Sequence, residues 1–172
     1  MDLLKSAATL FLLAAAQGAV PTRPNAVACA AANDIACIRD LLAKGADIEA
    51  RDSDGPTALM AGSQAGAIDA VKELLGRGAD LEAVDGSSHM NALTYAIWKQ
   101  KEEVILTLLA AGAKVEPTSG IDSPLFRAAV SGPHRIVALL LNAGASVESR
   151  TRYGETPLFI ASCNASTDEK LR

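Results

Sequence analysis

A Gly-Ala pair recurs four times at a nearly constant interval, and this period constrains the fold more than any other feature. The pairs begin at Gly45, Gly78, Gly112 and Gly144, each 32 to 34 residues after the one before. Leucines precede each pair, and a glutamate follows each glycine at a fixed offset: Glu49, Glu82, Glu116 and Glu148. A period of this length predicts a stack of supersecondary units, not one globular core.

Residues 54–83 show how one unit is built. Asp54-Gly55 is a turn dipeptide, and the Thr57 hydroxyl can cap a first helix that ends at Gly66. Gly78 stands where the end of a second helix requires the left-handed conformation. Between these glycines, apolar residues recur at helical spacing: Ile68, Val71, Leu74 and Leu75. Two short helices cannot bury such a face alone, so the unit must stack on copies of itself.

Two later units carry a motif that resembles the Thr-Pro-Leu-His-x-Ala signature of the ankyrin-repeat family. It reads Ser-Pro-Leu-Phe-Arg-Ala-Ala from Ser123 and Thr-Pro-Leu-Phe-Ile-Ala from Thr156, so Phe126 and Phe159 replace the histidine. The resemblance covers residues 24–172. It implies an all-α fold, an ankyrin-repeat solenoid of stacked helix-turn-helix units with hairpin loops.

The repeat boundaries follow from the same register. We expect four full repeats at about 24–50, 54–83, 85–116 and 120–148, and a partial fifth at 153–172. The chain stops where the second helix of the fifth repeat should begin. This favours either a truncated chain or another element that caps the stack, because the apolar flank of repeat four would otherwise be exposed.

The first nineteen residues differ from the rest and match a secretory signal peptide. Lys5 precedes an apolar run over residues 7–16, small residues follow at Ala14, Ala16 and Ala19, and Pro21 interrupts any helix. The run is too short to span a bilayer, so no stable membrane insertion is expected after cleavage. Residues 20–172 would then form a periplasmic or secreted ankyrin-repeat domain. The alternative is an N-terminal helix that caps repeat one in a cytoplasmic protein.

Two cysteines in repeat one are placed symmetrically about its turn. Cys29 and Cys37 each lie four residues from Asn33, so two antiparallel helices would bring them opposite each other. A disulfide could span that gap if the helices pack closely, and an exported protein would permit the bond. The alternative is two small buried cysteines in an alanine-rich core. Cys163 has no obvious partner.

The sequence argues against catalysis and against nucleic-acid binding. The net charge is −4, and no basic cluster is available to contact phosphates. His89 and His134 fall in different repeats, and no phosphate loop, nucleophile motif or Cys-x-x-Cys pair is present. We therefore expect no cofactor, no metal and no enzymatic activity. The four glutamates at the fixed offset should bond neighbouring loops or remain solvated.

What remains is recognition of another protein by a monomer. The ankyrin resemblance implies binding through the hairpin tips and the exposed side of the first helices, which form a concave strip. Tyr95 and Trp98 are three residues apart and should share one side of a helix, where aromatic residues make strong binding contacts. Matching the family pattern position by position selects Arg51, Asp52, Ser53, Pro56, Ser88, His89, Met90, Tyr95, Trp98, Lys99, Asp122, Arg127, Val130, Arg150, Arg152 and Tyr153. The alternative for Trp98 is packing on a loop or the next repeat.

The resemblance also suggests a narrower role. Some exported bacterial ankyrin proteins sit on periplasmic enzymes and inhibit them, which would require only that a rigid strip cover an active-site mouth. Two alternatives remain. The chain could be a scaffold fragment of a longer ankyrin solenoid, or a cytosolic effector-like ankyrin protein.

Overall fold

The computed structural model describes residues 25–51, 55–116, 123–131, 133–151 and 153–162, and these contain helices and loops but no strand. The structure confirms the predicted all-α fold. The helices are α2 (Ala26–Ala31), α3 (Ile35–Ala43), α4 (Ala58–Ala65), α5 (Ile68–Gly76), α6 (Ala92–Trp98), α7 (Glu102–Ala110), α8 (Pro124–Ser131) and α9 (His134–Asn142). A short helical segment over residues 157–162 follows α9.

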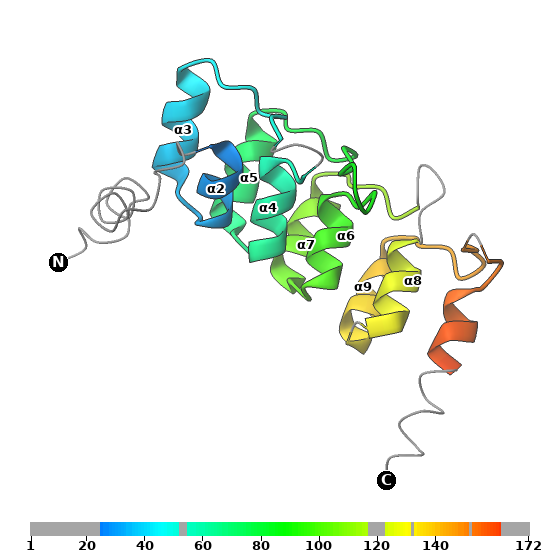
Figure 1. Cartoon of the computed structure of the whole chain (residues 1–172). Coiled ribbons are helices and arrows are strands. Elements are labelled where there is room, and N and C mark those ends of the chain that lie inside the picture. The colour runs from blue at the N-terminus through cyan, green and yellow to red at the C-terminus, as the bar shows by residue number, and fades with distance from the viewer. Residues whose placement is uncertain (1–24, 52–54, 117–122, 132, 152, 163–172) are drawn as a thin grey trace, which may run out of the picture.

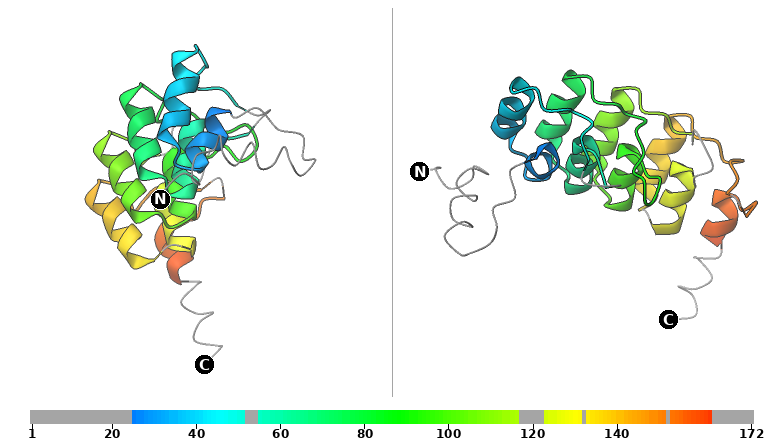
Figure 2. Two further views of the ribbon diagram at one scale, coloured as in Figure 1. Left: turned by 90° about the vertical axis from the view of Figure 1, so that its left-hand side faces the viewer. Right: turned by 45° about the horizontal axis from the view of Figure 1, so that its top comes forward.

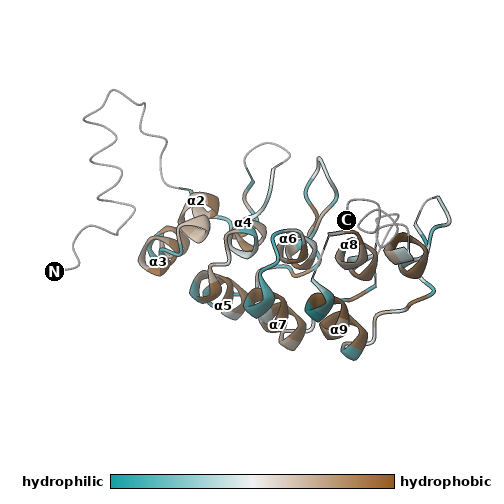
Figure 3. Cartoon of the chain, turned by 90° about the horizontal axis from the view of Figure 1, so that it is seen from below, coloured by the Kyte–Doolittle hydropathy of each residue, from teal (hydrophilic) through white to brown (hydrophobic). Residues whose placement is uncertain are grey.

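The helices form two layers along an extended stack (Figures 1 and 2). The first helix of each unit lies in one layer, α2, α4, α6 and α8, and the second helix lies in the other, α3, α5, α7 and α9 (Figure 3). The loop that joins α5 to α6 projects from the layer of first helices. Each unit therefore contacts its sequence neighbours, as the repeat period predicts.

The recurring Gly-Ala pair ends each second helix. Gly78 adopts φ +84°, which a residue with a Cβ rarely adopts. The Gly78 N–H donates to the Leu75 carbonyl at 3.0 Å, and the Ala79 N–H donates to the Leu74 carbonyl at 3.1 Å. This is the Schellman arrangement, and the alanine beside the glycine is buried against the stack. The periodic pair in the sequence is thus a helix stop repeated in every full unit.

Apolar side chains between the two layers form one continuous core. Its largest fully buried members come from both layers and from successive units: Ile38, Leu59, Leu74, Leu93, Ile97, Ile105, Leu108, Ile136 and Leu140. Gly62 lies close to its neighbours, since a Cβ at this position would be 3.6 Å from the Ala30 Cβ and 3.4 Å from a Val71 methyl, both ordinary van der Waals contacts. The core is therefore shared between units.

The glutamates at the fixed offset join each unit to the next. Glu49 Oε1 accepts a hydrogen bond from the Asp80 N–H at 2.8 Å, and Glu82 Oε1 accepts one from the Lys114 N–H at 2.9 Å. Glu116 Oε1 accepts from the Ser146 N–H at 2.6 Å. In each case the donor lies two residues after the glycine that ends the next unit's second helix. We call this series the glutamate ladder. For Glu49, Glu82 and Glu116 it confirms the hydrogen bond to a neighbouring loop, one of the two roles expected for these carboxylates.

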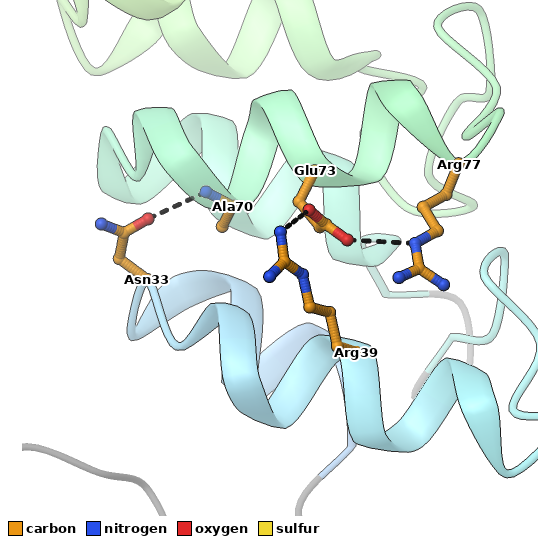
Figure 4. Close-up of polar contacts among 5 residues, drawn as sticks. All are labelled: Asn33, Arg39, Ala70, Glu73 and Arg77. Atoms are coloured by element: carbon orange, nitrogen blue, oxygen red, sulfur yellow. Dashed lines mark hydrogen bonds and ion pairs between the residues drawn. The ribbon is translucent and has the colours of Figure 1, made fainter.

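Repeats one and two are joined by further polar contacts (Figure 4). The Asn33 side-chain oxygen accepts the Ala70 N–H at 2.9 Å, at the start of α5. Glu73 lies between two guanidinium groups, 2.7 Å from Arg39 and 3.0 Å from Arg77. The Arg39 hydrogen bond is the main cause that lowers the pKa of Glu73 to about 2. This carboxylate therefore stays charged at neutral pH and bridges α3 and α5.

Cys29 and Cys37 are joined by a disulfide in the structure. Their Cα atoms are 5.9 Å apart, and the bond connects α2 to α3 across the turn at Asn33. Asn33 adopts φ +56°, which asparagine tolerates better than most residues. The bond therefore closes the two helices of repeat one on each other.

Several predictions from the sequence fall outside the described residues. These are the signal peptide over residues 1–19, Cys163, and four residues of the expected binding strip: Asp52, Ser53, Asp122 and Arg152. Where the chain is described, none of its helices has the length and hydrophobicity needed to cross a membrane.

Leu108→Ala should destabilise the stack strongly, because Leu108 is fully buried between units. We expect the free energy of unfolding to fall by about 2–5 kcal/mol, as for other core leucines. Leu106 is the matched control, since it lies on the same helix but is 45% exposed. Urea denaturation of Leu108→Ala and Leu106→Ala would measure the difference. Equal losses in the two variants would contradict the shared core.

Candidate partner-binding surface

The hairpin of repeat three is organised by one buried carboxylate, Asp85, which is 1% exposed. Its oxygens accept hydrogen bonds from the Ser87 hydroxyl at 2.7 Å, the Ser88 N–H at 3.0 Å and the Met90 N–H at 2.6 Å. The Ser88 hydroxyl adds contacts at 2.7 and 2.9 Å, and the Tyr95 hydroxyl donates at 3.3 Å. The Asp85 side chain therefore links the loop to helix α6 through hydrogen bonds.

The ionisation of this group follows from its surroundings. Burial raises the pKa of Asp85, but the hydrogen bonds from Ser88, Ser87 and the Met90 backbone outweigh it and lower the pKa to about 2. Burial, together with the Asp85 charge, raises the pKa of Tyr95. At neutral pH the pair is thus a carboxylate that accepts a hydrogen bond from a neutral phenol.

The structure corrects the expectation that Tyr95 and Met90 belong to an exposed strip. Tyr95 is 7% exposed and Met90 is also buried. Both residues donate hydrogen bonds to the buried Asp85 carboxylate, Tyr95 through its hydroxyl and Met90 through its backbone N–H. These bonds hold them against the hairpin. Tyr95 therefore contacts the loop through Asp85, while Ser88 and His89 of the same loop remain exposed.

Trp98 is the large aromatic residue that this arrangement leaves at the surface. Its side chain is 46% exposed at the end of α6. The Tyr95 and Trp98 rings are 6.3 Å apart between centroids and tilted by 58°. The Lys99 Nζ lies 3.9 Å from the centroid of the Trp98 ring, within range of a cation–π contact. Because Tyr95 points to the hairpin and Trp98 shares its side of the helix, Trp98 lies on the hairpin side of the stack.

The remaining described members of the expected strip lie in loops and in helix α8. Arg51 and Arg150 are exposed, and each guanidinium donates to a backbone carbonyl, of Val84 and Gly154 respectively. Pro56 and Arg127 are half-buried, and the Arg127 Nε has no acceptor among the described residues. Val130 and Tyr153 are exposed. The strip that the structure describes thus combines basic groups with apolar and aromatic surface.

Asp85 and Glu73 are two carboxylates whose pKa values are lowered to about 2. Across the described ranges, no group of three or more His, Cys, Asp or Glu side chains could hold a metal ion. The two strongly acidic carboxylates, Asp85 and Glu73, are occupied by hydrogen bonds within the fold. Neither is poised to transfer protons near neutral pH.

The organising role of Asp85 was missed from the sequence, although the segment was assigned to a hairpin. The signal was present in the run Asp85-Gly86-Ser87-Ser88, because aspartate followed by serines favours loops closed by side-chain hydrogen bonds. What the run does not show is the burial of Asp85, which depends on Tyr95 ten residues later.

Comparison with known proteins places the chain in a family. The family model "Ankyrin repeats (3 copies)" matches residues 26–119, and "Ankyrin repeats (many copies)" matches residues 125–168. The chain therefore belongs to the ankyrin-repeat family, whose members generally bind other proteins. Over 71 residues it is 39% identical to Ankyrin repeat and SOCS box protein 11 of Danio rerio. That match covers 41% of this chain and 24% of the relative.

Asp85→Asn should loosen the hairpin, because an amide cannot accept all the donors that converge on the carboxylate. We expect a loss of about 1.5–3 kcal/mol in the free energy of unfolding at pH 7, as for hydrogen bonds to a charged group. The pKa of Asp85 is lower in the fold than the ordinary 3.8, so its stabilisation is present above pH 3.8 and is lost as the pH falls toward 2.

Urea denaturation between pH 2 and 7 measures both effects. The wild type should lose more stability than Asp85→Asn as the pH falls from about 4 to 2, since the variant lacks this titrating group. Glu103→Gln is the matched control, because it removes an exposed carboxylate from the next helix. Parallel curves for wild type and Asp85→Asn would contradict the role given to Asp85.

Proposed function

We propose that the chain binds another protein through the hairpin side of its first helices, with Trp98 at the centre of the contact. The surface, which we call the recognition strip, consists of Arg51, Ser88, His89, Trp98, Lys99, Arg127, Val130, Arg150 and Tyr153. The observation that carries the proposal is the exposure of Trp98 at the end of α6. Tryptophan, tyrosine and arginine dominate the binding energy of protein interfaces, and all three occur on the strip.

The exposure of Trp98 is informative because aromatic residues are rare in this chain. The sequence has one Trp, two Tyr and three Phe, and its core is built largely from smaller aliphatic residues. Lys99 covers one face of the ring without burying it. Single exposed apolar residues are common on protein surfaces. Tryptophan, however, is one of the residues that dominate binding hot spots, so its exposure favours a contact role.

The charge of the strip supports a partner with acidic groups. Its formally charged members are Arg51, Lys99, Arg127 and Arg150, whereas the chain as a whole carries −4. Opposite charges across an interface speed association and exclude wrong partners more than they raise affinity. The basic strip would therefore orient an acidic surface, and Trp98 would supply the contact energy.

The hairpin hydrogen bonds support tight binding by a second route. Asp85 bonds both the exposed hairpin residue Ser88 and the Tyr95 hydroxyl, and the Tyr95 ring lies 6.3 Å from the Trp98 ring. A loop that is already ordered loses little conformational entropy when a partner docks. The buried pair therefore contributes to recognition although it does not touch the partner.

A narrower proposal is that the protein is exported and inhibits a periplasmic enzyme by covering its active-site mouth. The sequence pattern of residues 1–19 supports export, and the Cys29–Cys37 disulfide suits an oxidising compartment. Occlusion would require only a rigid strip. A scaffold within a longer ankyrin solenoid and a cytosolic effector-like protein are the competing roles.

Trp98→Ala should weaken partner binding and leave the fold nearly intact. Truncating a central aromatic contact removes about 2 kcal/mol, which corresponds to an affinity loss of about thirtyfold. The measurement is affinity capture from a native extract, with the retained protein identified by mass spectrometry and its affinity then measured. Leu106→Ala is the matched control, because Leu106 is as exposed as Trp98 but lies in the layer of second helices.

Two results would count against the strip. One is equal capture by wild type and Trp98→Ala. The other is a large drop in melting temperature for Trp98→Ala, since that would assign Trp98 to packing.

Export predicts a shortened chain with oxidised cysteines. Mass spectrometry of the protein isolated from its native source should find a new N-terminus near Gln17 or Val20. Peptides containing Cys29 and Cys37 should be linked before reduction and separate after it. On the loop-entropy model the bond stabilises the fold by about 2–3 kcal/mol. An intact Met1 together with two free thiols would rule out the exported role and favour the cytosolic one.

A further inference from the structure

The two helices of repeat one are joined by a covalent bond at core positions that later repeats fill with small or apolar residues. By the repeat register, Cys29 matches the position occupied by Gly62, Ala96 and Ala128 in later first helices. Cys37 matches the position occupied by Ala70, Val104 and Ile136 in later second helices. All six of these residues are buried. In repeat one, the Cys29–Cys37 disulfide therefore stands where packing alone serves the later units.

Apart from that bond, helix α2 has weak attachments to the rest of the stack. It spans six residues, and its side chains are four alanines, one valine and the bonded cysteine, so none can form an ion pair. Ala26 occupies the position at which later first helices carry a buried leucine: Leu59, Leu93 or Leu125. Alanine buries much less apolar surface than leucine, and a helix this short is not stable by itself.

Helix α3 is attached to repeat two by contacts that do not involve the disulfide. Ile38 is fully buried in the shared core. Arg39 pairs with Glu73 at 2.7 Å, and the Asn33 side chain accepts the Ala70 N–H just before α3 begins (Figure 4). Cutting the bond would therefore leave α3 in place, whereas α2 would keep only its alanine and valine packing.

We propose that the Cys29–Cys37 disulfide is a redox-sensitive switch, which holds α2 against α4 when oxidised and releases α2 when reduced. The reductant is a dithiol. One of its thiolates attacks the sulfur of Cys37, which is half-buried, because Cys29 is only 1% exposed. The Cys29 thiolate leaves, and the second thiol of the reductant then displaces Cys37. The bond takes up two electrons and two protons to give two thiols, and the dithiol becomes a disulfide.

Release of α2 would change one part of the stack only. Helix α2 lies beside α4 in the layer of first helices (Figures 1 and 3), where Ala30 is next to Gly62. Reduction would uncover this flank of α4. The later units share a core that continues through α4 to α9, so they should remain stacked. Trp98 lies two units away, and the switch therefore does not depend on the recognition strip.

Hydrogen exchange of the full chain, measured by NMR before and after reduction with dithiothreitol, tests the switch. The chain is first oxidised with oxidised glutathione, and peptide mapping verifies the bond. Reduction should then speed exchange of the amides of residues 28–32 by about thirtyfold or more, which is the effect of opening a loop of this length on the loop-entropy model. The amides of α5 and α7 should change by less than about threefold.

Two variants serve as controls. Cys29→Ala/Cys37→Ala should exchange like the reduced wild type, and dithiothreitol should not alter it further. Cys163→Ser should respond to dithiothreitol as the wild type does, since Cys163 is not part of the bond.

Three results would overturn the proposal. Unchanged exchange of residues 28–32 on reduction would show that packing alone holds α2. Loss of protection throughout α5 and α7 would show that the bond supports the whole stack. Failure of Cys29 and Cys37 to form the bond in oxidised glutathione would remove the switch itself.

Discussion

The structure depends on the inability of each two-helix unit to bury its own apolar face. Each of the first three units has half-buried leucines packed against the shared core, and the next unit donates a backbone N–H to the glutamate that follows them. The apolar contact supplies most of the free energy, and the hydrogen bond sets the spacing of the units. Stability is therefore distributed along the stack.

Much of this could be predicted from the sequence, because the signals are local and periodic. Gly78 with Ala79 predicts a helix stop, Thr57 predicts a helix start, and the structure confirms both. The glutamate ladder was visible as a fixed offset, although the sequence could not choose between a hydrogen bond and a solvated side chain. In the structure, Glu49, Glu82 and Glu116 make the same hydrogen bond, each to a backbone N–H of the next unit.

The binding surface was harder to predict, and Tyr95 shows why. Its register in the helix placed it on the hairpin side, which is correct, but register does not decide burial. That depends on a contact with Asp85, ten residues away in the hairpin of repeat three. Trp98 lies one turn later, beyond the reach of that carboxylate, and stays exposed. The helical pattern thus placed Tyr95 and Trp98 on the same side of α6. Their different burial follows from their different surroundings.

Hydrogen exchange of the chain with and without its captured partner tests the central claim most directly, since it reports every segment at once. If the partner binds on the recognition strip, amide protection should increase in residues 85–99 and in the neighbouring hairpins. The exposed side of α5 and α7 should exchange at an unchanged rate. Protection confined to the second helices, with residues 85–99 unaffected, would contradict the account and move the interface to the opposite layer.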